Sequence, residues 1–325
     1  MILAGDIGGT NSRLALYSPD GRRVVRLEKF ESRAHTSLES VVRAFVGKRP
    51  PKITAACFGV AGPVIGQRCT ATNLPWVIDA RSLARRLKIK RVTLINDLVA
   101  LALGALTVRS GKLHPLRGGE LPKKRGANLA ILAAGTGLGE AALLWDGLRF
   151  VPCATEGGHV DFAPRSQVEW DLLTFLQKKF GRVSYERVLS GPGLGNLYDF
   201  FRDGKKMRET ARAESRIVGA RDRNHEIVEL ALSGDSEVAV KTVELFVSIY
   251  GAEAGNMCLR TLATGGLFVA GSIAGSLVKF LENGDFLKSF GAKGRLSPLL
   301  ADIPIALVKD TEIGIAGSAY HATHR

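Results

Sequence analysis

Residues 5–11 read GDIGGTN, and they continue an apolar run that predicts the first strand of the chain. Gly8 and Gly9 leave backbone N–H groups accessible to an anion, because no Cβ atom stands in the way. Thr10 adds a hydroxyl donor, and the carboxylate of Asp6 can hold Mg²⁺ directly or through water. A tight hairpin turn accounts for the same residues, so this segment alone leaves both interpretations open.

The same pattern recurs later in the chain. Residues 3–21 align without a gap with residues 129–147, at an offset of 126 positions (129 minus 3). Each copy has a strand-like run, a Gly/Thr segment, a second run and an Asp-Gly pair, which is a strong hairpin signal. The shared order of turns suggests two similar lobes, each presenting one Gly/Thr turn to a shared cleft. The pair therefore favours phosphate binding over two unrelated hairpins.

Neither Gly/Thr segment fits the commoner nucleotide motifs. The Walker A pattern requires Gly-Lys followed by Ser or Thr, and no such tripeptide occurs in the chain. The pattern G-x-G-x-x-G fails in both candidates, because position 140 is Glu and position 196 is Asn. Any phosphate site built from these turns is therefore of another kind.

The composition is that of an ordinary globular protein, since 46% of the 325 residues are hydrophobic and 23% are charged. The length suits two lobes better than a single core. No apolar run reaches the ~18 residues of a membrane helix, and no basic-then-apolar leader precedes the first strand. The four cysteines are scattered without zinc-binding spacing, which predicts free thiols in a reducing cytosol.

The net charge of +14 is unusual, and basic residues cluster at 81–91 and 202–216. Such clusters can indicate a polyanionic partner. Neither cluster interleaves aromatic residues for base stacking, and neither has the spacing of a helix-turn-helix or a zinc finger. A solvated basic surface is the favoured interpretation, and nucleic acid is not an expected partner.

Helical and strand-like stretches alternate, which predicts an α/β protein. Apolar spacing predicts a helix over 34–47, with Thr36 and Glu39 as its capping box. The segments 96–106 and 312–322 are rich in Ala and Gly, and we expect these two helices to pack closely. Buried strands are predicted at 53–60, at 91–95 and at the start of 267–277.

Polar residues stand where predicted strands end. Asn96 and Asp97 follow the strand 91–95, and open α/β sheets bind ligands at the carboxyl ends of their strands. Asp97 could equally be the N-cap of the next helix. The stretch EGGH at 156–159 offers a carboxylate and an imidazole that suit vicinal sugar hydroxyls. A di-metal Glu-x-x-His site would need a helix and a second copy, and two glycines disfavour the helix.

These segments resemble the sugar kinase, heat-shock chaperone and actin superfamily. GDIGGTN and AAGTGLG resemble its two phosphate motifs, and LFVAGSIA resembles its adenosine motif. Within the superfamily, the ordered set resembles bacterial-type glucokinase, nearly from end to end. The set comprises TNLPWVID (72–79), LINDLVALALGA (94–105), CATEGGHVDFAP (153–164), ERVLSGPGLGNLYDF (186–200) and GGLFVAGSIA (265–274).

The resemblance implies an α/β, two-lobed actin-like ATPase fold with duplicated ribonuclease-H-like domains and a central cleft. Residues 1–106 and 307–325 would form the small lobe, and residues 107–306 the large lobe. The implied activity is ATP-dependent phosphorylation of glucose at its 6-hydroxyl. The resemblance further implies Mg²⁺ bound with ATP, no structural zinc, a cytoplasmic location and a homodimer.

Two alternatives remain. A related hexose kinase could act on fructose, mannose or N-acetylmannosamine, or use polyphosphate as donor. The repressor and kinase family with those substrates typically has a cysteine-rich zinc motif after its histidine, whereas VDFAP follows His159. A non-catalytic assembly protein of the actin type would not need the Asn-Asp and Glu-Gly-Gly-His segments.

The resemblance also assigns roles to individual residues. Asp97 would be the catalytic base, and Asp6 would hold Mg²⁺. The glucose-binding residues would be Asn73, Asn96, Asp97, Glu156, His159 and Glu186. The nucleotide-binding residues would be Gly5, Asp6, Ile7, Gly8, Gly9, Thr10, Asn11, Gly135, Thr136, Gly137 and Gly271. Without the resemblance, Asn73 fits an ordinary turn and Glu186 fits a solvated surface position.

Overall fold

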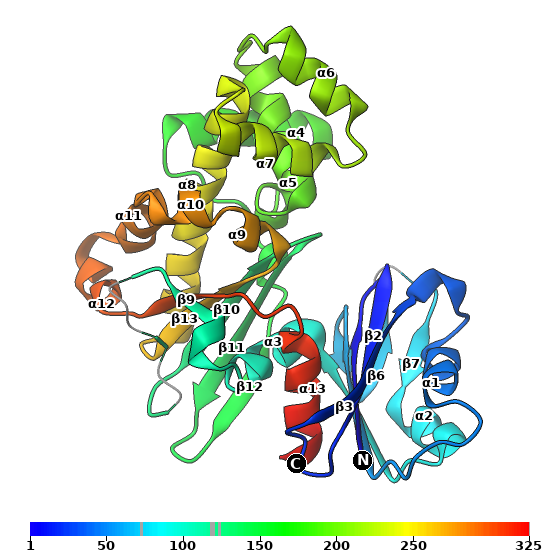
Figure 1. The fold of residues 1–325 in the computed structure, drawn as a ribbon. Coiled ribbons are helices and arrows are strands. Elements are labelled where there is room, and N and C mark those ends of the chain that lie inside the picture. Colours follow the sequence, from blue (N-terminus) through cyan, green and yellow to red (C-terminus); the bar gives the residue numbers. More distant parts are fainter. Residues whose placement is uncertain (72–73, 118–120, 123–124, 325) are drawn as a thin grey trace. The chain divides into compact units, whose positions relative to one another are not determined.

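The structure is a computed structural model, and it describes residues 1–71, 74–117, 121–122 and 125–324 (Figure 1). The chain forms two compact units. Unit 1 contains Met1–Leu113, Ala141–Ala154 and Asp310–Arg325, and unit 2 contains His114–Glu140 and Thr155–Lys309. Unit 1 therefore gathers segments from both ends of the sequence.

Unit 1 is built on a five-stranded sheet. Its strands are β1 (Ile2–Ile7), β2 (Asn11–Tyr17), β3 (Val24–Glu31), β4 (Ala55–Val60) and β8 (Arg91–Asn96), in the order β3-β2-β1-β4-β8. β1 pairs antiparallel with β2 and parallel with β4, which pairs parallel with β8. β4 is buried along its whole length, which explains its continuous small and apolar sequence. A smaller sheet contains β5 (Val64–Ile65), β6 (Arg68–Thr70) and β7 (Val77–Asp79).

The helices of unit 1 are α1 (Leu38–Val46), α2 (Ala80–Leu87), α3 (Asp97–Ala105) and α13 (Ile313–Thr323). The predicted apolar face of α1 is confirmed, because its residues Leu38, Val41, Val42 and Phe45 are buried in the core. The predicted cap at Thr36 is wrong. Ser37 caps the helix instead, and its hydroxyl accepts from the N–H of Ser40 at 3.2 Å.

A second sheet contains the other copy of the repeat. Its strands are β9 (Leu113–Pro115), β10 (Leu129–Ala134), β11 (Leu138–Trp145), β12 (Phe150–Ala154), β13 (Gly266–Ala270) and β14 (Ile305–Val308), in the order β12-β11-β10-β13-β14-β9. β13 pairs parallel with β10 and with β14. Both copies of the repeat therefore fold as strand, Gly/Thr turn and adjacent strand, as the sequence predicts.

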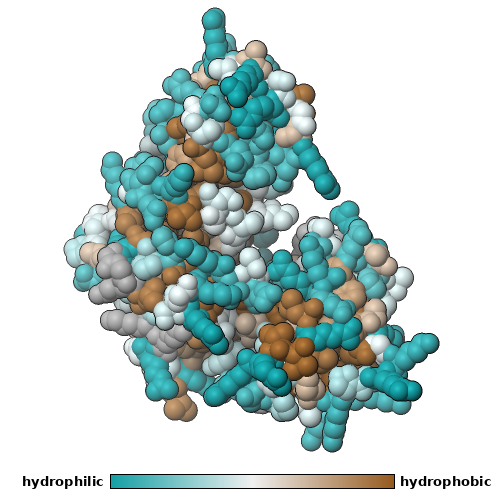
Figure 2. Space-filling model, in the orientation of Figure 1, coloured by the Kyte–Doolittle hydropathy of each residue, from teal (hydrophilic) through white to brown (hydrophobic). Residues whose placement is uncertain are grey.

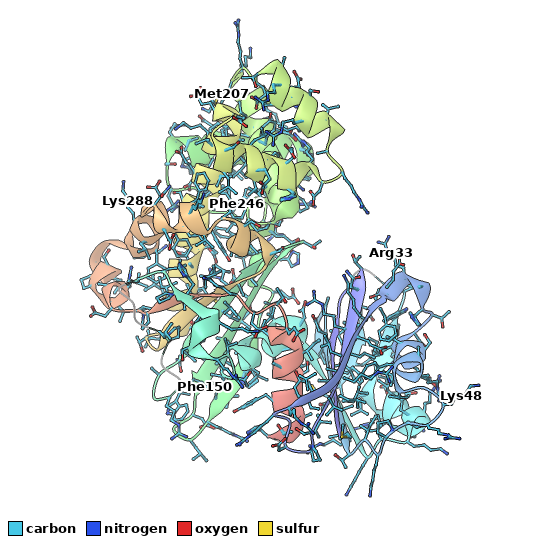
Figure 3. The ribbon with its side chains drawn as sticks, in the orientation of Figure 1. Arg33, Lys48, Phe150, Met207, Phe246 and Lys288 are labelled. Carbon is cyan, nitrogen blue, oxygen red and sulfur yellow. The ribbon has the colours of Figure 1, made fainter. Side chains whose placement is uncertain are left out.

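Of these strands, β12 and most of β11 belong to unit 1, which contains Ala141–Ala154. Outside the sheet, unit 2 is mainly helical. Its helices are α4 (Gln167–Phe180), α5 (Gly191–Asp199), α6 (Ala211–Gly219), α7 (Arg223–Ser233), α8 (Glu237–Thr261), α9 (Ser272–Ser276), α10 (Val278–Glu282), α11 (Asp285–Gly291) and α12 (Ser297–Ala301). The 25-residue helix α8 packs against α11, α7 and α5. Phe246, labelled in Figure 3, lies on α8 and is fully buried.

Hydrophilic side chains cover most of the face shown in Figure 2. In the part of the chain that the structure describes, no helix is both long and apolar enough to cross a membrane. The apolar segment at 98–106 lies mostly in α3, most of whose residues are buried.

In unit 1, the backbones of α3 and α13 are in direct contact. A Cβ atom at Gly104 would lie 1.9 Å from the carbonyl oxygen of Ile313, and one at Gly317 would lie 1.7 Å from that of Ala100. Neither distance can accommodate a side chain, so both positions require glycine. The close packing that the Ala- and Gly-rich segments predict is confirmed.

The same helix α13 is bonded to the sheet. The Ser318 hydroxyl donates to the carbonyl of Gly5 on β1 at 2.9 Å, and it accepts from the N–H of Gly59 on β4 at 3.2 Å. One buried side chain thus joins α13 to two central strands. The segment that ends the sequence completes the unit in which the sequence begins.

Gly317→Ala should lower the melting temperature of the protein clearly. The new methyl group would overlap the backbone of α3, and the overpacking cost of about 3 kcal/mol exceeds the ~1 kcal/mol that alanine adds to a helix. Gly111→Ala is the control, because a Cβ atom there meets nothing within 4 Å. Equal melting temperatures for both variants would show that the two helices can separate without cost.

Candidate active site

The first Gly/Thr turn joins β1 to β2. The N–H of Gly8 donates to the carbonyl of Asn11 at 3.0 Å, which closes the turn. Ser32 supports it, since its hydroxyl donates to the Gly8 carbonyl at 2.7 Å and its N–H donates to the Thr10 carbonyl at 2.9 Å. Thr10 itself is exposed. The turn has a backbone fixed by hydrogen bonds and an exposed hydroxyl residue, and both features favour the binding of an anion.

Gly5 and Ile7, also predicted for the nucleotide site, lie inside β1. Ile7 is only 1% exposed. A Cβ atom at Gly5 would lie 2.5 Å from the side chain of Phe58 and 2.9 Å from that of Leu14. Packing of the sheet therefore explains the glycine at this position.

Asp6 lies just before the turn, and its carboxylate is 4.0 Å from the guanidinium of Arg13. Burial raises the pKa of Asp6 above its usual range, and the charge of Arg13 opposes that change. The side chain is still 36% exposed, so water moderates the effect and an ion can reach it. A carboxylate beside the Gly/Thr turn is a hard oxygen ligand of the kind that Mg²⁺ prefers.

The second Gly/Thr turn joins β10 to β11 in unit 2. The N–H of Gly135 donates to the carbonyl of Gly137 at 2.9 Å, and the N–H of Gly191 donates to the carbonyl of Gly135 at 2.8 Å. The turn is thereby bonded to the first residue of α5. Ser190 caps α5, and its hydroxyl accepts from the N–H of Gly193 at 3.0 Å.

A cavity of about 390 Å³ opens at this turn, within unit 2. Its volume lies in the range of small-molecule sites. Its walls come from the turn, from the starts of α5, α7 and α9, and from nearby residues of these helices. The lining residues are Gly135, Thr136, Gly191, Pro192, Leu194, Asp222, Asn224, His225, Val228, Ser272, Ile273 and Ser276.

Most of these lining residues are absent from the sequence-based site. Asp222 caps α7, and its carboxylate accepts from the N–H groups of Asn224 and His225 at 3.0 and 3.2 Å. In the sequence, Asp222 and the residues after it show only the pattern of a helix N-cap. Asp222 and Thr136 line the same cavity only because of the tertiary fold, so local sequence patterns could not predict this.

Gly271, the predicted adenosine residue, joins β13 to α9. Its φ angle is +95°, and a Cβ atom would lie 2.1 Å from the carbonyl oxygen of Ala134 on β10. Glycine is thus required by both backbone conformation and space. The next residue, Ser272, lines the cavity.

Asn96 and Asp97 stand where β8 ends and α3 begins. The N-cap is Asn96, not Asp97, because the Asn96 side chain accepts from the N–H groups of Leu98 and Val99 at 2.9 and 3.3 Å. Its amide nitrogen donates to the carbonyl of Gly62 at 3.2 Å. The Asp97 carboxylate accepts from the N–H of the next residue, Leu98, at 3.0 Å. The cap role thus belongs to its neighbour.

The stretch EGGH forms a 3-10 turn, η3 (Gly157–His159), rather than an α-helix. The side chains of Glu156 and His159 are 56% and 57% exposed, with Oε2 and Nε2 4.0 Å apart. The two glycines are buried against β11, where a Cβ atom at Gly158 would lie 2.1 Å from the carbonyl oxygen of Leu138. The glycines therefore bring two exposed polar side chains close together above the strand.

Glu186 lies on a second 3-10 turn, η4 (Tyr185–Arg187), which is bonded to the residues after η3. The N–H of Tyr185 donates to the carbonyl of Val160 at 3.0 Å. The Glu186 carboxylate accepts from the N–H of Leu138 at 3.0 Å, and a Cβ atom at Gly137 would lie 2.4 Å from it. Glu186 therefore contacts the start of β11, directly after the second Gly/Thr turn.

The sequence-based sites fall in both units. Asp6, the first turn, Asn96 and Asp97 belong to unit 1, and the second turn, Glu156, His159, Glu186 and Gly271 belong to unit 2. Asn73 lies outside the described residues.

The chain matches the family model described as Glucokinase over residues 3–325. A glucokinase from Synechocystis sp. is 40% identical over 343 aligned positions, which cover 98% of this chain and 96% of that protein. A glucokinase from Hahella chejuensis is 36% identical and covers 98% of this chain and 95% of its own length.

A solved glucokinase structure from an Antarctic psychrotroph has a TM-score of 0.84 at 29% identity, with 100% of this chain and 99% of that chain covered. The structural match confirms the actin-like sugar kinase fold that the sequence predicts. The family match and the identity to curated relatives confirm the resemblance drawn from the motifs. The chain belongs to the glucokinase family.

Proposed function

We propose that this protein transfers the γ-phosphoryl group of ATP to the 6-hydroxyl of glucose, with Asp97 as the catalytic base. Membership of the glucokinase family supports the reaction. The observation that carries the role of Asp97 is its place at the carboxyl end of β8, at the first residue of α3. The cap that this helix needs is supplied by Asn96, so capping does not account for the carboxylate.

The chemistry asks little of the base. Phosphoryl transfer passes through a loose transition state, so the hydroxyl proton can leave late. A carboxylate can first orient the hydroxyl as an acceptor and then take its proton. Asn96 has its side chain engaged with the helix and with Gly62, so it would hold Asp97 in place as much as it would bind sugar.

The remaining glucose contacts are proposed to come from Glu156, His159 and Glu186 in unit 2. Carboxylates accept hydrogen bonds from hydroxyls, and an imidazole can donate or accept. The exposed pair on η3 and the acceptor on η4 belong to turns that are bonded to each other. These turns would thus supply part of the glucose site.

ATP is proposed to occupy the unit 2 cavity, where backbone N–H groups and the Thr136 hydroxyl of the second Gly/Thr turn would contact its phosphates. The first Gly/Thr turn, with the Thr10 hydroxyl, is proposed as a phosphate-binding turn of unit 1. Mg²⁺ held by Asp6 would neutralise phosphate charge when bound. On the basis of the motif resemblance, we also propose a cytoplasmic location and a homodimer. Sedimentation analysis would measure the oligomeric state.

Asp97→Asn should lower kcat by about 100-fold or more, with a smaller effect on glucose KM. The amide keeps the shape and a hydrogen bond but cannot accept the proton. Glu156→Gln should show the reverse proportion, with a larger effect on glucose KM. Steady-state kinetics in a coupled glucose 6-phosphate assay measure both. A near-normal kcat for Asp97→Asn, with unchanged melting behaviour, would remove Asp97 from the role of base.

Gly135→Val should weaken ATP binding and leave glucose binding largely intact. A Cβ atom at Gly135 meets only the Ser272 hydroxyl, at 3.9 Å, so the side chain would enter the cavity without disturbing the core. Calorimetry with each ligand separately measures the two affinities. Gly291→Val is the matched control, because a Cβ atom there meets nothing within 4 Å. Unchanged ATP affinity would place the nucleotide elsewhere.

Gly137→Val should impair both ligands, in contrast to Gly135→Val. Its side chain would displace the Glu186 carboxylate, which lies 2.4 Å from the position of the new Cβ atom. The expected result is a higher glucose KM together with weaker ATP binding. If glucose KM stays normal in a folded variant, Glu186 does not bind the sugar.

A further inference from the structure

Glu140 is a buried acid that the proposed reaction does not use. It lies on β11, and it is 1% exposed. Neither of its carboxyl oxygens has a hydrogen-bond partner in the described part of the chain. Burying a carboxylate without hydrogen-bond donors costs a large free energy, so the Glu140 side chain is expected to be protonated and to interact with a nearby charged group.

The neighbour is a second acid. Glu253 on α8 is fully buried, and its carboxylate accepts from the Asn256 amide at 2.9 Å and from the Arg260 guanidinium. Arg260 is also 3.6 Å from Glu140, but its side chain is 42% exposed. Glu140 and Glu253 lie beside one guanidinium, so one negative charge is balanced and the second acid retains a proton. Glu140 holds this proton, because it has no hydrogen-bond donors of its own.

The surrounding groups determine which acid is neutral. Burial and the nearby Glu253 charge raise the pKa of Glu140 to about 8, and Arg260 opposes this. Burial and the charge of Arg165 lower the pKa of Lys293 to about 8. The Lys293 ammonium donates to Asn256 at 2.5 Å, and the amide of Asn256 in turn donates to Glu253. A protonated Glu140 can donate to Glu253, which completes the network.

Glu140 also supports the turn that carries the proposed sugar residues. A Cβ atom at Gly157 would lie 2.1 Å from Oε2 of Glu140, so the carboxyl group lies directly against the Gly157 backbone. The Thr155 hydroxyl donates to the Glu140 carbonyl at 2.9 Å and accepts from the N–H of Gly157 at 3.2 Å. The main chain of Glu140 is therefore bonded to this segment through Thr155, and its side chain packs against the Gly157 backbone.

We propose that Glu140 is a positioning residue for glucose, which, as a neutral acid bonded to Glu253, holds the Gly157 backbone and so fixes the spacing of Glu156 and His159. The inference rests on the proposed glucose-binding role of those two residues. Ionisation would place a second negative charge beside Glu253 and push the two carboxyl groups apart. Since Glu140 contacts the turn, its displacement would move the turn and weaken glucose binding.

The predicted pH dependence follows from the protonated form. The ordinary pKa of a glutamic acid is about 4.3, so the folded protein holds this proton between about pH 4.3 and 8, whereas the unfolded chain does not. The folded state binds more protons in that range, so this group's contribution to stability decreases as the pH rises. Above about pH 8 the contribution is constant, because both states have lost the proton.

The experiment compares the wild type with Glu140→Gln and Glu140→Ala from pH 6 to 9. In the wild type, glucose KM should rise about tenfold from pH 7 to 9, following loss of the proton, while ATP KM changes much less. Glu140→Gln should keep glucose KM within about twofold of wild type at pH 7 and should abolish the extra rise, because an amide donates at every pH. Glu140→Ala should raise glucose KM at all pH values.

Melting temperatures give a second readout. The difference between Glu140→Gln and wild type should grow in favour of the variant from pH 5 to 8 and then level off. Glu169→Gln is the matched control, since Glu169 is a buried acid of the same unit that pairs with Arg165. It should reduce stability without changing glucose KM or its pH profile.

Two results would overturn the inference. One is a parallel rise of glucose KM with pH in wild type and Glu140→Gln. The other is a normal glucose KM in folded Glu140→Ala. Glu156→Gln, measured alongside, separates this failure from that of the proposed function: an unchanged glucose KM in Glu156→Gln means that the sugar binds elsewhere.

Discussion

The backbone contact between α3 and α13 is the constraint on which unit 1 depends. Gly104 and Gly317 let the two helices approach until the backbone of each limits the other. α3 begins at Asp97, so this contact also positions the residue proposed as base. Ser318 on α13 is bonded to both central strands of the sheet, one of which leads into the first Gly/Thr turn. Helix packing and site geometry are therefore parts of one arrangement.

Much of this was accessible from the sequence, because it depends on local patterns. The repeat of strand, Gly/Thr turn and strand appears as hairpin chemistry in both copies, and the structure has both. The apolar spacing of α1 and the small residues of α3 and α13 also predicted what is observed. The cap at Ser37 shows the limit of such patterns, since adjacent Thr and Ser residues offer the same chemistry and only the geometry selects one.

Other features depend on segments that are far apart in the chain. The cavity of unit 2 is lined by the second Gly/Thr turn and by the starts of α5, α7 and α9, and no local motif predicts that these segments lie together. Glu140 appeared in the sequence only as the residue that breaks a glycine motif. Its burial against Gly157 and Glu253 instead suggests a role in positioning the η3 turn. That role depends on β11, α8 and η3 packing together. Charged residues in cores are the hardest to interpret from sequence, because their state depends on every neighbour.

The contribution of α13 to unit 1 has a consequence for how the chain is made. A ribosome synthesises the sheet of unit 1 early, but it delivers α13 only after the whole of Thr155–Lys309. Until then, β1 and β4 lack the bonds that Ser318 later makes to both of them. Nascent unit 1 therefore stays incomplete while unit 2 is made, and incomplete units of this kind are prone to aggregation. A protein that lacked Ile313–Thr323 would keep unit 1 in that incomplete state.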